Sequence, residues 1–290
     1  MIDLRQSPQF GKYTKAIGWK VEKIGDFQVF IRPLPLIGSL IKTQRPNSIS
    51  FGKIDELAKK YKALFVKLEP VPPLNKKIRE QLHHHGYRQD SWPLLPTRTV
   101  WIDLTKTENQ LWEEMAKDTR YCIRRAEKRG IKIFRRADIE NFYNNFRKFG
   151  KGDVPRKTKF QALVKAFGKK ALLLSCNSFA GSLVLIDGKR AYYYYAFTSS
   201  LGRKLFAQHL LIWEAIKLAK KLNCQLFDLE GIEDPRYKVT RRWRGFSHFK
   251  KSFGGKEVEF PGSFTKYYHP VAKLLSRTKN LVQDLFPRLA

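Results

Sequence analysis

Short apolar runs separated by turn residues recur along the chain and predict a mixed α/β protein. In the first 100 residues such runs lie at 27–32, 48–51 and 63–68, and a helical pattern covers 54–61. Apolar runs of four to eight residues bounded by Gly, Pro, Asn or Asp indicate strands. We therefore predict that residues 1–100 form one mixed α/β unit.

The remainder of the chain has a more regular pattern. It predicts strands at 99–104, 131–134, 171–175, 182–186, 191–197 and 225–230, and helices at 107–129, 138–148, 159–167, 203–222 and 271–286. The dipeptide Asp187-Gly188 is a hairpin turn signal. Three hairpin-linked strands, a long helix and a further strand resemble the core order of GNAT acyltransferases, and fold alone leaves the function open.

The net charge indicates a polyanionic partner. The chain has 57 Lys and Arg against 26 Asp and Glu, a formal net charge of +31. So large a charge repels itself in the compact state, and nucleic acid, an anionic membrane or a phosphorylated ligand would neutralise it. The alternative is a generally lysine-rich proteome.

Neither cofactor nor metal is expected. The three cysteines are far apart in sequence and form no CxxC pair, which fits a reducing compartment. His83, His84 and His85 are consecutive, so on a helix they point in different directions. The loop at 198–203 has one glycine, a weak signal for a CoA pyrophosphate site. No apolar stretch of about 18 residues is present, so we expect a cytoplasmic protein.

Two cationic clusters stand out. On the predicted helix 107–129, Lys117, Arg120, Arg124, Arg125 and Lys128 fall on one face at three- and four-residue steps. This face is either an anion-binding rail or an ordinary solvated surface.

Residues 236–255 interleave seven cations with five aromatics. Such a mixture suits the phosphates and unpaired bases of an RNA 3′ end. The alternative is that the aromatics are core residues and the lysines extend past them to solvent.

Several segments together resemble the FemABX peptidoglycan aminoacyltransferases. They run in family order: FVKLEP at 65–70, the TVWIDL ending of 96–104, KDTRYCIRRAEK at 117–128, YYAF at 194–197, FDLEGI at 227–232 and FKKSFGG at 249–255. The resemblance implies an α/β (α+β) fold of two GNAT-like domains, with mixed sheets flanked by helices and no coiled-coil arm. We predict domains at 1–100 and 101–290, with a C-terminal helix in 263–290 that packs back on the first domain.

The resemblance also implies an activity and partners. In the family, an amino acid moves from aminoacyl-tRNA to the stem-peptide amine of a peptidoglycan precursor, either UDP-MurNAc-pentapeptide or lipid II. We expect a monomer without a cofactor, in the cytoplasm and in peripheral contact with the inner face of the membrane. The alternatives are a GNAT-like N-acyltransferase using acyl-CoA or another donor, and a non-catalytic RNA- or membrane-surface-binding protein.

Site residues follow from the same resemblance. Lys250 matches the lysine that stabilises the developing oxyanion, Phe249 the aromatic beside it, and Glu69 a carboxylate near the acceptor amine. The predicted substrate-binding residues are Lys42, Arg45, Arg120, Tyr121, Arg124, Arg156 and Tyr195. The predicted tRNA-binding residues are Arg241, Arg242, Trp243, Arg244 and Lys251. Arg45-Pro46 replaces the family's glycine-proline.

Overall fold

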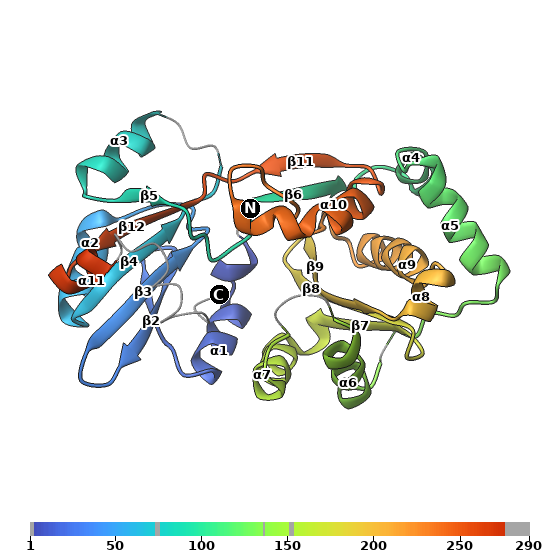
Figure 1. The fold of residues 1–290 in the computed structure, drawn as a ribbon, viewed down its shortest axis with the longest axis horizontal. Helices are drawn as coiled ribbons and strands as arrows, with labels where there is room; N and C mark the ends of the chain where they lie inside the picture. The colour runs from blue at the N-terminus through green and yellow to red at the C-terminus, as the bar shows by residue number, and fades with distance from the viewer. Residues whose placement is uncertain (1–2, 73–75, 136, 151–153, 276–290) are drawn as a thin grey trace. The chain divides into compact units, whose positions relative to one another are not determined.

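The computed structural model describes residues 3–72, 76–135, 137–150 and 154–275. The chain divides into two compact units (Figure 1). Unit 1 comprises Met1–Thr97 together with Glu259–Ala290, and unit 2 comprises Arg98–Val258. Each unit has its own six-stranded sheet in the described residues. The predicted mixed α/β class with GNAT-like sheets flanked by helices is confirmed.

The sheet of unit 1 has the order β1-β2-β3-β4-β12-β5. Its strands are β1 (Lys20–Ile24), β2 (Phe27–Leu34), β3 (Gly38–Gln44), β4 (Ala63–Glu69), β5 (Arg88–Asp90) and β12 (Ser263–Tyr267). The helices of this unit are η1 (Leu4–Gln6), α1 (Pro8–Ala16), α2 (Phe51–Lys60), α3 (Lys76–His84) and α11 (Pro270–Leu275).

Alternation along β3 and β4 gives this sheet one apolar and one partly polar face. Ile41 and Val66 join the core beneath Ile54 of α2. The intervening residues face the other way, and the parallel register pairs Lys42 with Lys67. Side chains of a strand alternate between faces, so this register brings two buried lysines to one face.

The sheet of unit 2 has the order β11-β6-β10-β9-β8-β7, with β10 parallel to β9. Its strands are β6 (Arg98–Asp103), β7 (Ala171–Cys176), β8 (Ala180–Asp187), β9 (Arg190–Thr198), β10 (Leu226–Asp228) and β11 (Lys256–Glu259). Its helices are α4 (Glu108–Glu113), α5 (Lys117–Lys128), α6 (Ile139–Phe149), α7 (Lys157–Phe167), η2 (Gly168–Lys170), α8 (Ser200–Lys204), α9 (Ala207–Lys221), η3 (Lys238–Trp243) and α10 (Arg244–Lys251).

Helices cover both faces of the second sheet. Ile123 of α5 and Leu211 of α9 are fully buried in the core with Val184 of β8. Phe142 of α6 packs on the opposite side, with its ring 5.2 Å from that of Phe197 in β9. The two layers shield the central strands from solvent.

Both long predicted helices are interrupted. The helix at 107–129 divides into α4 and α5 because Ala116 is extended, and its N–H donates to Ser252 O at 2.9 Å instead of continuing the helix. The helix at 203–222 divides into α8 and α9 at Phe206, which has φ +57°. In each case tertiary packing overrides helix propensity.

Other predicted elements also need correction. Residues 48–51 form no strand, since Phe51 begins α2. Residues 131–134 contribute only the single bridge between Phe134 and Ser175. The predicted helix in 263–290 is wrong at its start, where β12 pairs with β4 and β5. The helix α11 follows, and residues 276–290 lie outside the described residues.

Candidate functional site

Lys250 is a half-buried residue of unit 2 that lies beside two aromatic rings. Its Nζ donates to Gly231 O at 2.8 Å and lies 5.1 Å from the ring centroid of Phe246 and 5.8 Å from that of Tyr193. Burial lowers its pKa to about 8, although the carboxylates of Glu230 and Asp228 act in the opposite direction. At neutral pH the ammonium is therefore mainly charged, with two N–H groups left for a ligand.

Asp228 is a buried carboxylate at the same end of the sheet. It accepts hydrogen bonds from the Thr99 hydroxyl, from Trp101 Nε1 at 2.9 Å and from Glu230 N at 2.7 Å. Burial raises its pKa to about 6, and the nearby Glu230 adds to the increase. The sequence analysis did not select Asp228. The sequence feature that could have indicated it is the T-x-W spacing, which places the two donors Thr99 and Trp101 on one face of β6.

The position of α10 is fixed by residues on both sides of Lys250. The Phe249 ring packs edge-on against His209 at 4.9 Å and against the buried Phe253 at 5.3 Å. Gly254 and Gly255 both have positive φ, and a Cβ on Gly255 would lie 2.5 Å from Trp101 O. Only glycine satisfies both conditions there, so the FGG turn holds the helix close to β6.

His209 is a neutral member of this aromatic group. Burial lowers its pKa to about 4. Its ring lies 5.9 Å from that of Phe206. A histidine that stays uncharged among aromatic rings acts here as a packing residue.

The predicted tRNA-binding residues gather on η3 and α10. Arg241 and Arg242 are exposed, and Trp243 is half-buried with its ring 5.8 Å from that of Phe246. Arg244 forms an ion pair with Glu233 at 3.3 Å, and Lys251 forms one with Glu257 at 2.8 Å. The four cations are thus exposed and Trp243 is half-buried, on the two helices η3 and α10.

The predicted substrate-binding residues of unit 2 are dispersed. Arg120 bonds Glu113 at the corner between α4 and α5. Arg124 lies over the Trp112 ring at 5.2 Å, and Tyr121 is 56% exposed. Tyr195 packs against Phe146 on the α6 side of the sheet, and Arg156 is exposed before α7. These side chains do not form one pocket.

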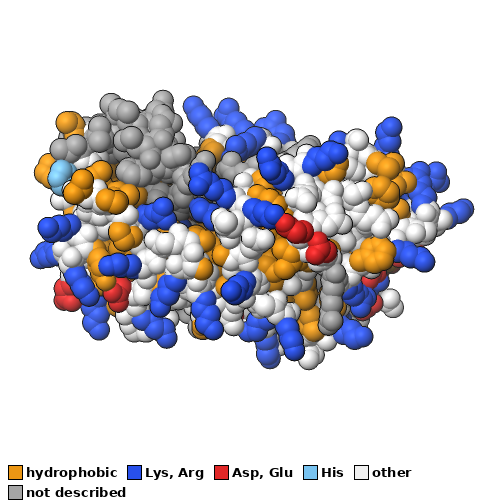
Figure 2. Space-filling view, turned by 90° about the horizontal axis from the view of Figure 1, so that it is seen from below, with side chains coloured by type: hydrophobic (Ala, Val, Ile, Leu, Met, Phe, Trp, Pro, Cys, Tyr) orange, Lys and Arg blue, Asp and Glu red, His pale blue; other side chains and the backbone are white. Residues whose placement is uncertain are grey.

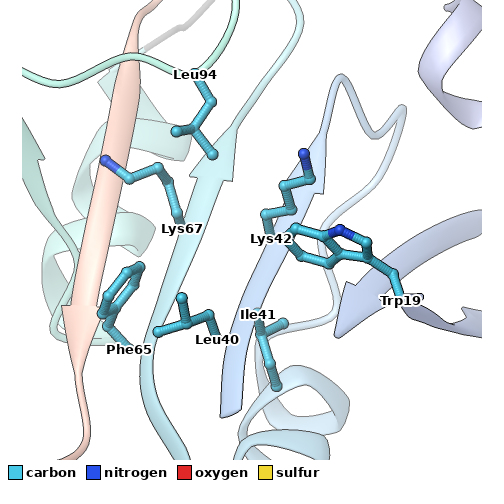
Figure 3. Close-up of a pocket in the computed structure, with 7 residues that line it drawn as sticks. All are labelled: Trp19, Leu40, Ile41, Lys42, Phe65, Lys67 and Leu94. Carbon is cyan, nitrogen blue, oxygen red and sulfur yellow. The ribbon is translucent and has the colours of Figure 1, made fainter. Parts of the chain in front are cut away.

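In unit 1, Lys42 is one of the residues that line a shallow recess, together with Trp19 and Lys67. Figure 3 shows Lys42 and Lys67 extending from adjacent strands, with Trp19 beside Lys42. Lys42 Nζ lies 4.7 Å from the Trp19 ring centroid. Lys67 is paired with Asp90 at 2.7 Å and also donates to Trp92 O at 2.7 Å.

Glu69 and Arg45 are engaged in contacts within unit 1. Glu69 Oε1 accepts from Leu94 N at 2.7 Å and Leu95 N at 2.9 Å, and its Oε2 accepts from Gln44 at 3.2 Å. The Arg45 guanidinium donates to Pro70 O and Pro96 O and lies over the Phe260 ring. In this geometry both side chains hold loops in place.

Two other features are absent from the part of the chain that the structure describes. Within the described residues, no group of three or more His, Cys, Asp or Glu side chains could hold a metal ion. No helix in the same part of the chain is long and apolar enough to span a membrane.

Comparison with known proteins gave one family match and several fold matches. Residues 155–280 match the model of the FemAB family. The crystal structure of FemX matches with a TM-score of 0.77 at 16% identity, covering 95% of this chain and 94% of that chain.

Two further solved structures share the fold. The C-terminal domain of a putative lysylphosphatidylglycerol synthetase from Agrobacterium fabrum has a TM-score of 0.62 at 11% identity, covering 96% of this chain and 93% of that chain. A tandem GNAT protein from the clavulanic acid pathway has a TM-score of 0.55 at 10% identity, covering 87% and 84%. No curated protein matches.

Proposed function

Because residues 155–280 of this chain match the model of the FemAB family, we propose that the protein is an aminoacyltransferase that builds peptidoglycan bridges. The proposed donor is aminoacyl-tRNA, and the proposed acceptor is the stem-peptide amine of UDP-MurNAc-pentapeptide or lipid II. We place the protein in the cytoplasm, as a monomer in peripheral contact with the inner membrane face. The single observation that carries the proposal is a partly desolvated lysine, Lys250, among exposed cations.

The chemistry needs a positioned cation. The acceptor amine attacks the carbonyl carbon of the ester, a C–N bond forms, and the C–O bond to the ribose breaks. The amine loses a proton, and the ribose oxygen gains one. In the transition state the carbonyl oxygen carries negative charge, which the Lys250 ammonium stabilises. Low local polarity strengthens this interaction.

The neighbours of Lys250 support that role. Asp228 and Glu230 favour the charged form of the lysine. Phe249 fixes the helix through its aromatic contacts, and Trp243 offers a half-buried ring on which a terminal base can stack. Arg241 and Arg242 supply charge for the phosphates.

Unit 1 is the proposed acceptor site. Lys42, over the Trp19 ring, is the candidate for a precursor phosphate. Arg45 and Glu69 position the loops beside it, since their polar atoms already bond the chain. Arg156 remains a second candidate for a phosphate contact because its side chain is exposed.

The test is transfer of radiolabelled amino acids from a total aminoacyl-tRNA pool to nucleotide-linked and lipid-linked muropeptides. The expected result is labelled acceptor with the wild-type protein and loss of label with Lys250→Met. Absence of transfer to every acceptor would refute the proposal. Parallel assays with acyl-CoA donors would then show whether the protein is a GNAT-like N-acyltransferase.

A further inference from the structure

The exposed face of α5 carries an ordered cationic row that the proposed chemistry leaves unused. Lys117, Tyr121, Arg124 and Lys128 follow one another at steps of four, three and four residues, and all four are exposed. At 1.5 Å per residue the row is about 16 Å long. Arg125 flanks it, while Ile123 on the opposite face is fully buried.

The cations of this helix outnumber its acidic residues, which are Asp118 and Glu127. In the described part of the chain, Lys117, Arg125 and Lys128 form no ion pair, and Arg124 contacts the Trp112 ring rather than a carboxylate. Like charges three and four residues apart destabilise a helix. Figure 2 shows one face of the molecule as a whole, on which blue Lys and Arg side chains outnumber the red Asp and Glu side chains, in line with the net charge of +31. A bound polyanion would relieve this repulsion.

The row is continuous with the helix that carries Lys250. Ala116 N donates to Ser252 O at 2.9 Å, and Thr119 Oγ1 donates to Ser252 Oγ at 2.7 Å. The start of α5 therefore abuts the end of α10, two residues after Lys250. Figure 1 shows α10 in orange and α5 in green within unit 2. Exposed cations are therefore present on η3, on α10 and on α5, and the last two elements are joined by these hydrogen bonds.

We propose that the exposed row of α5 binds the sugar-phosphate backbone of the double-stranded acceptor stem of the aminoacyl-tRNA whose 3′ end reaches Lys250. This inference rests on the proposed function. Proteins contact duplex RNA mainly through its shape, phosphates and 2′-hydroxyls, for which exposed Lys and Arg are suited. The row lies beyond the single-strand cluster of η3 and α10, where a stem would follow its unpaired end.

The composition of the row favours RNA over a membrane surface. A helix that lies in a lipid interface buries an apolar face among the acyl chains. Among the described residues of α5, the one exposed large hydrophobic side chain is Tyr121, which can also contact sugars or bases. The remaining apolar side chains of α5, such as Ile123, are used in the core.

The test uses the triple variant Lys117→Gln, Arg125→Gln and Lys128→Gln in the full-length protein. Its affinity for tRNA is measured over a range of salt concentrations. We expect a loss of about tenfold or more at 100 mM salt and a salt slope lower by about 2 to 3, as three lost phosphate contacts imply. The matched control, Lys165→Gln, Lys169→Gln and Lys170→Gln, removes three exposed charges from the α7 region and should bind like wild type.

A second measurement distinguishes binding of the double-stranded stem from binding of the 3′ end. Transfer is compared between full aminoacyl-tRNA and a short aminoacylated single-stranded 3′-end oligonucleotide. The α5 variant should lose kcat/KM with the full donor and keep it with the short one. Equal tRNA affinity of variant and wild type, or an equal loss with both donors, would overturn the inference.

The remaining outcomes are also distinguishable. Loss of binding to vesicles containing anionic lipid, with unchanged tRNA affinity, would assign the row to a membrane and reject the RNA interpretation. If wild type binds tRNA through α5 but transfers nothing, the proposed function fails while the surface stands. Thermal melting of each variant checks that its fold is intact.

Discussion

Replacing Lys250 by methionine tests the role of its charge with little change in volume. The ammonium lies 2.8 Å from Gly231 O and near two aromatic rings, so methionine keeps the packing and removes the cation. Loss of one oxyanion-stabilising donor costs about 10²- to 10³-fold in kcat, or roughly 3 to 4 kcal/mol. We expect a loss of that size, with a smaller change in tRNA affinity.

The pH dependence gives an independent check. Burial lowers the Lys250 pKa to about 8, so the charged form is lost as pH rises through that value. The rate of wild type should therefore fall above pH 8, about tenfold per unit where chemistry limits turnover. In Lys250→Arg the guanidinium stays charged, so whatever activity remains should no longer fall there.

The assay is single-turnover transfer from purified aminoacyl-tRNA between pH 6.5 and 9.5. Lys256→Met is the matched control, because this exposed lysine of β11 lies outside the proposed site. A Lys250→Met rate within threefold of wild type would refute the reasoning. So would a decline near pH 8 that persists in Lys250→Arg.

Three further predictions concern the supporting residues. Because burial lowers the pKa of His209 to about 4, the free energy of unfolding should be highest above pH 6.5 and should fall as the pH drops from 6.5 toward 4, by at most about 3 kcal/mol. In His209→Phe the melting temperature should depend less on pH over that range. Gly255→Ala should lower the free energy of unfolding by more than about 1 kcal/mol, measured by urea titration, because of its positive φ and its closeness to Trp101 O. Glu69→Gln should cost about 1 to 3 kcal/mol of stability; a general base would instead show lost transfer with unchanged unfolding.

Local pattern predicted most of the strands and none of the helix interruptions. The hairpin at Asp187-Gly188 follows directly from its turn residues, whereas the register shift between Leu183 and Val184 in the pairing of β8 and β9 has no such local signal. The break at Ala116 could not be predicted, because the hydrogen bond that replaces the helical one comes from Ser252, 136 residues away. The pairing of β12 with β4 likewise depends on a strand from the other end of the chain.

The candidate site was predicted only in part, because contacts between residues far apart in the sequence also decide which side chains are buried. Charge and aromatic content pointed to residues 236–255, where the structure places Lys250 and its exposed neighbours. Roles that depend on burial could not be predicted from the sequence. The sequence predicts that Arg45 binds substrate and that Glu69 lies near the acceptor amine. In the structure their polar atoms form hydrogen bonds with backbone groups of unit 1. Asp228 gave no charge signal, since one acidic residue in a strand is unremarkable until its burial is known.

The FKKSFGG segment fixes the position of the Lys250 side-chain amine. Phe249 and Phe253 anchor the two ends of the turn in the core, and Gly255 permits contact with β6. Ser252 ties the same turn to α5. These restraints fix the backbone on both sides of Lys250, and its Nζ donates to Gly231 O. A cation that is held in place before the reaction is what the proposed electrostatic catalysis requires.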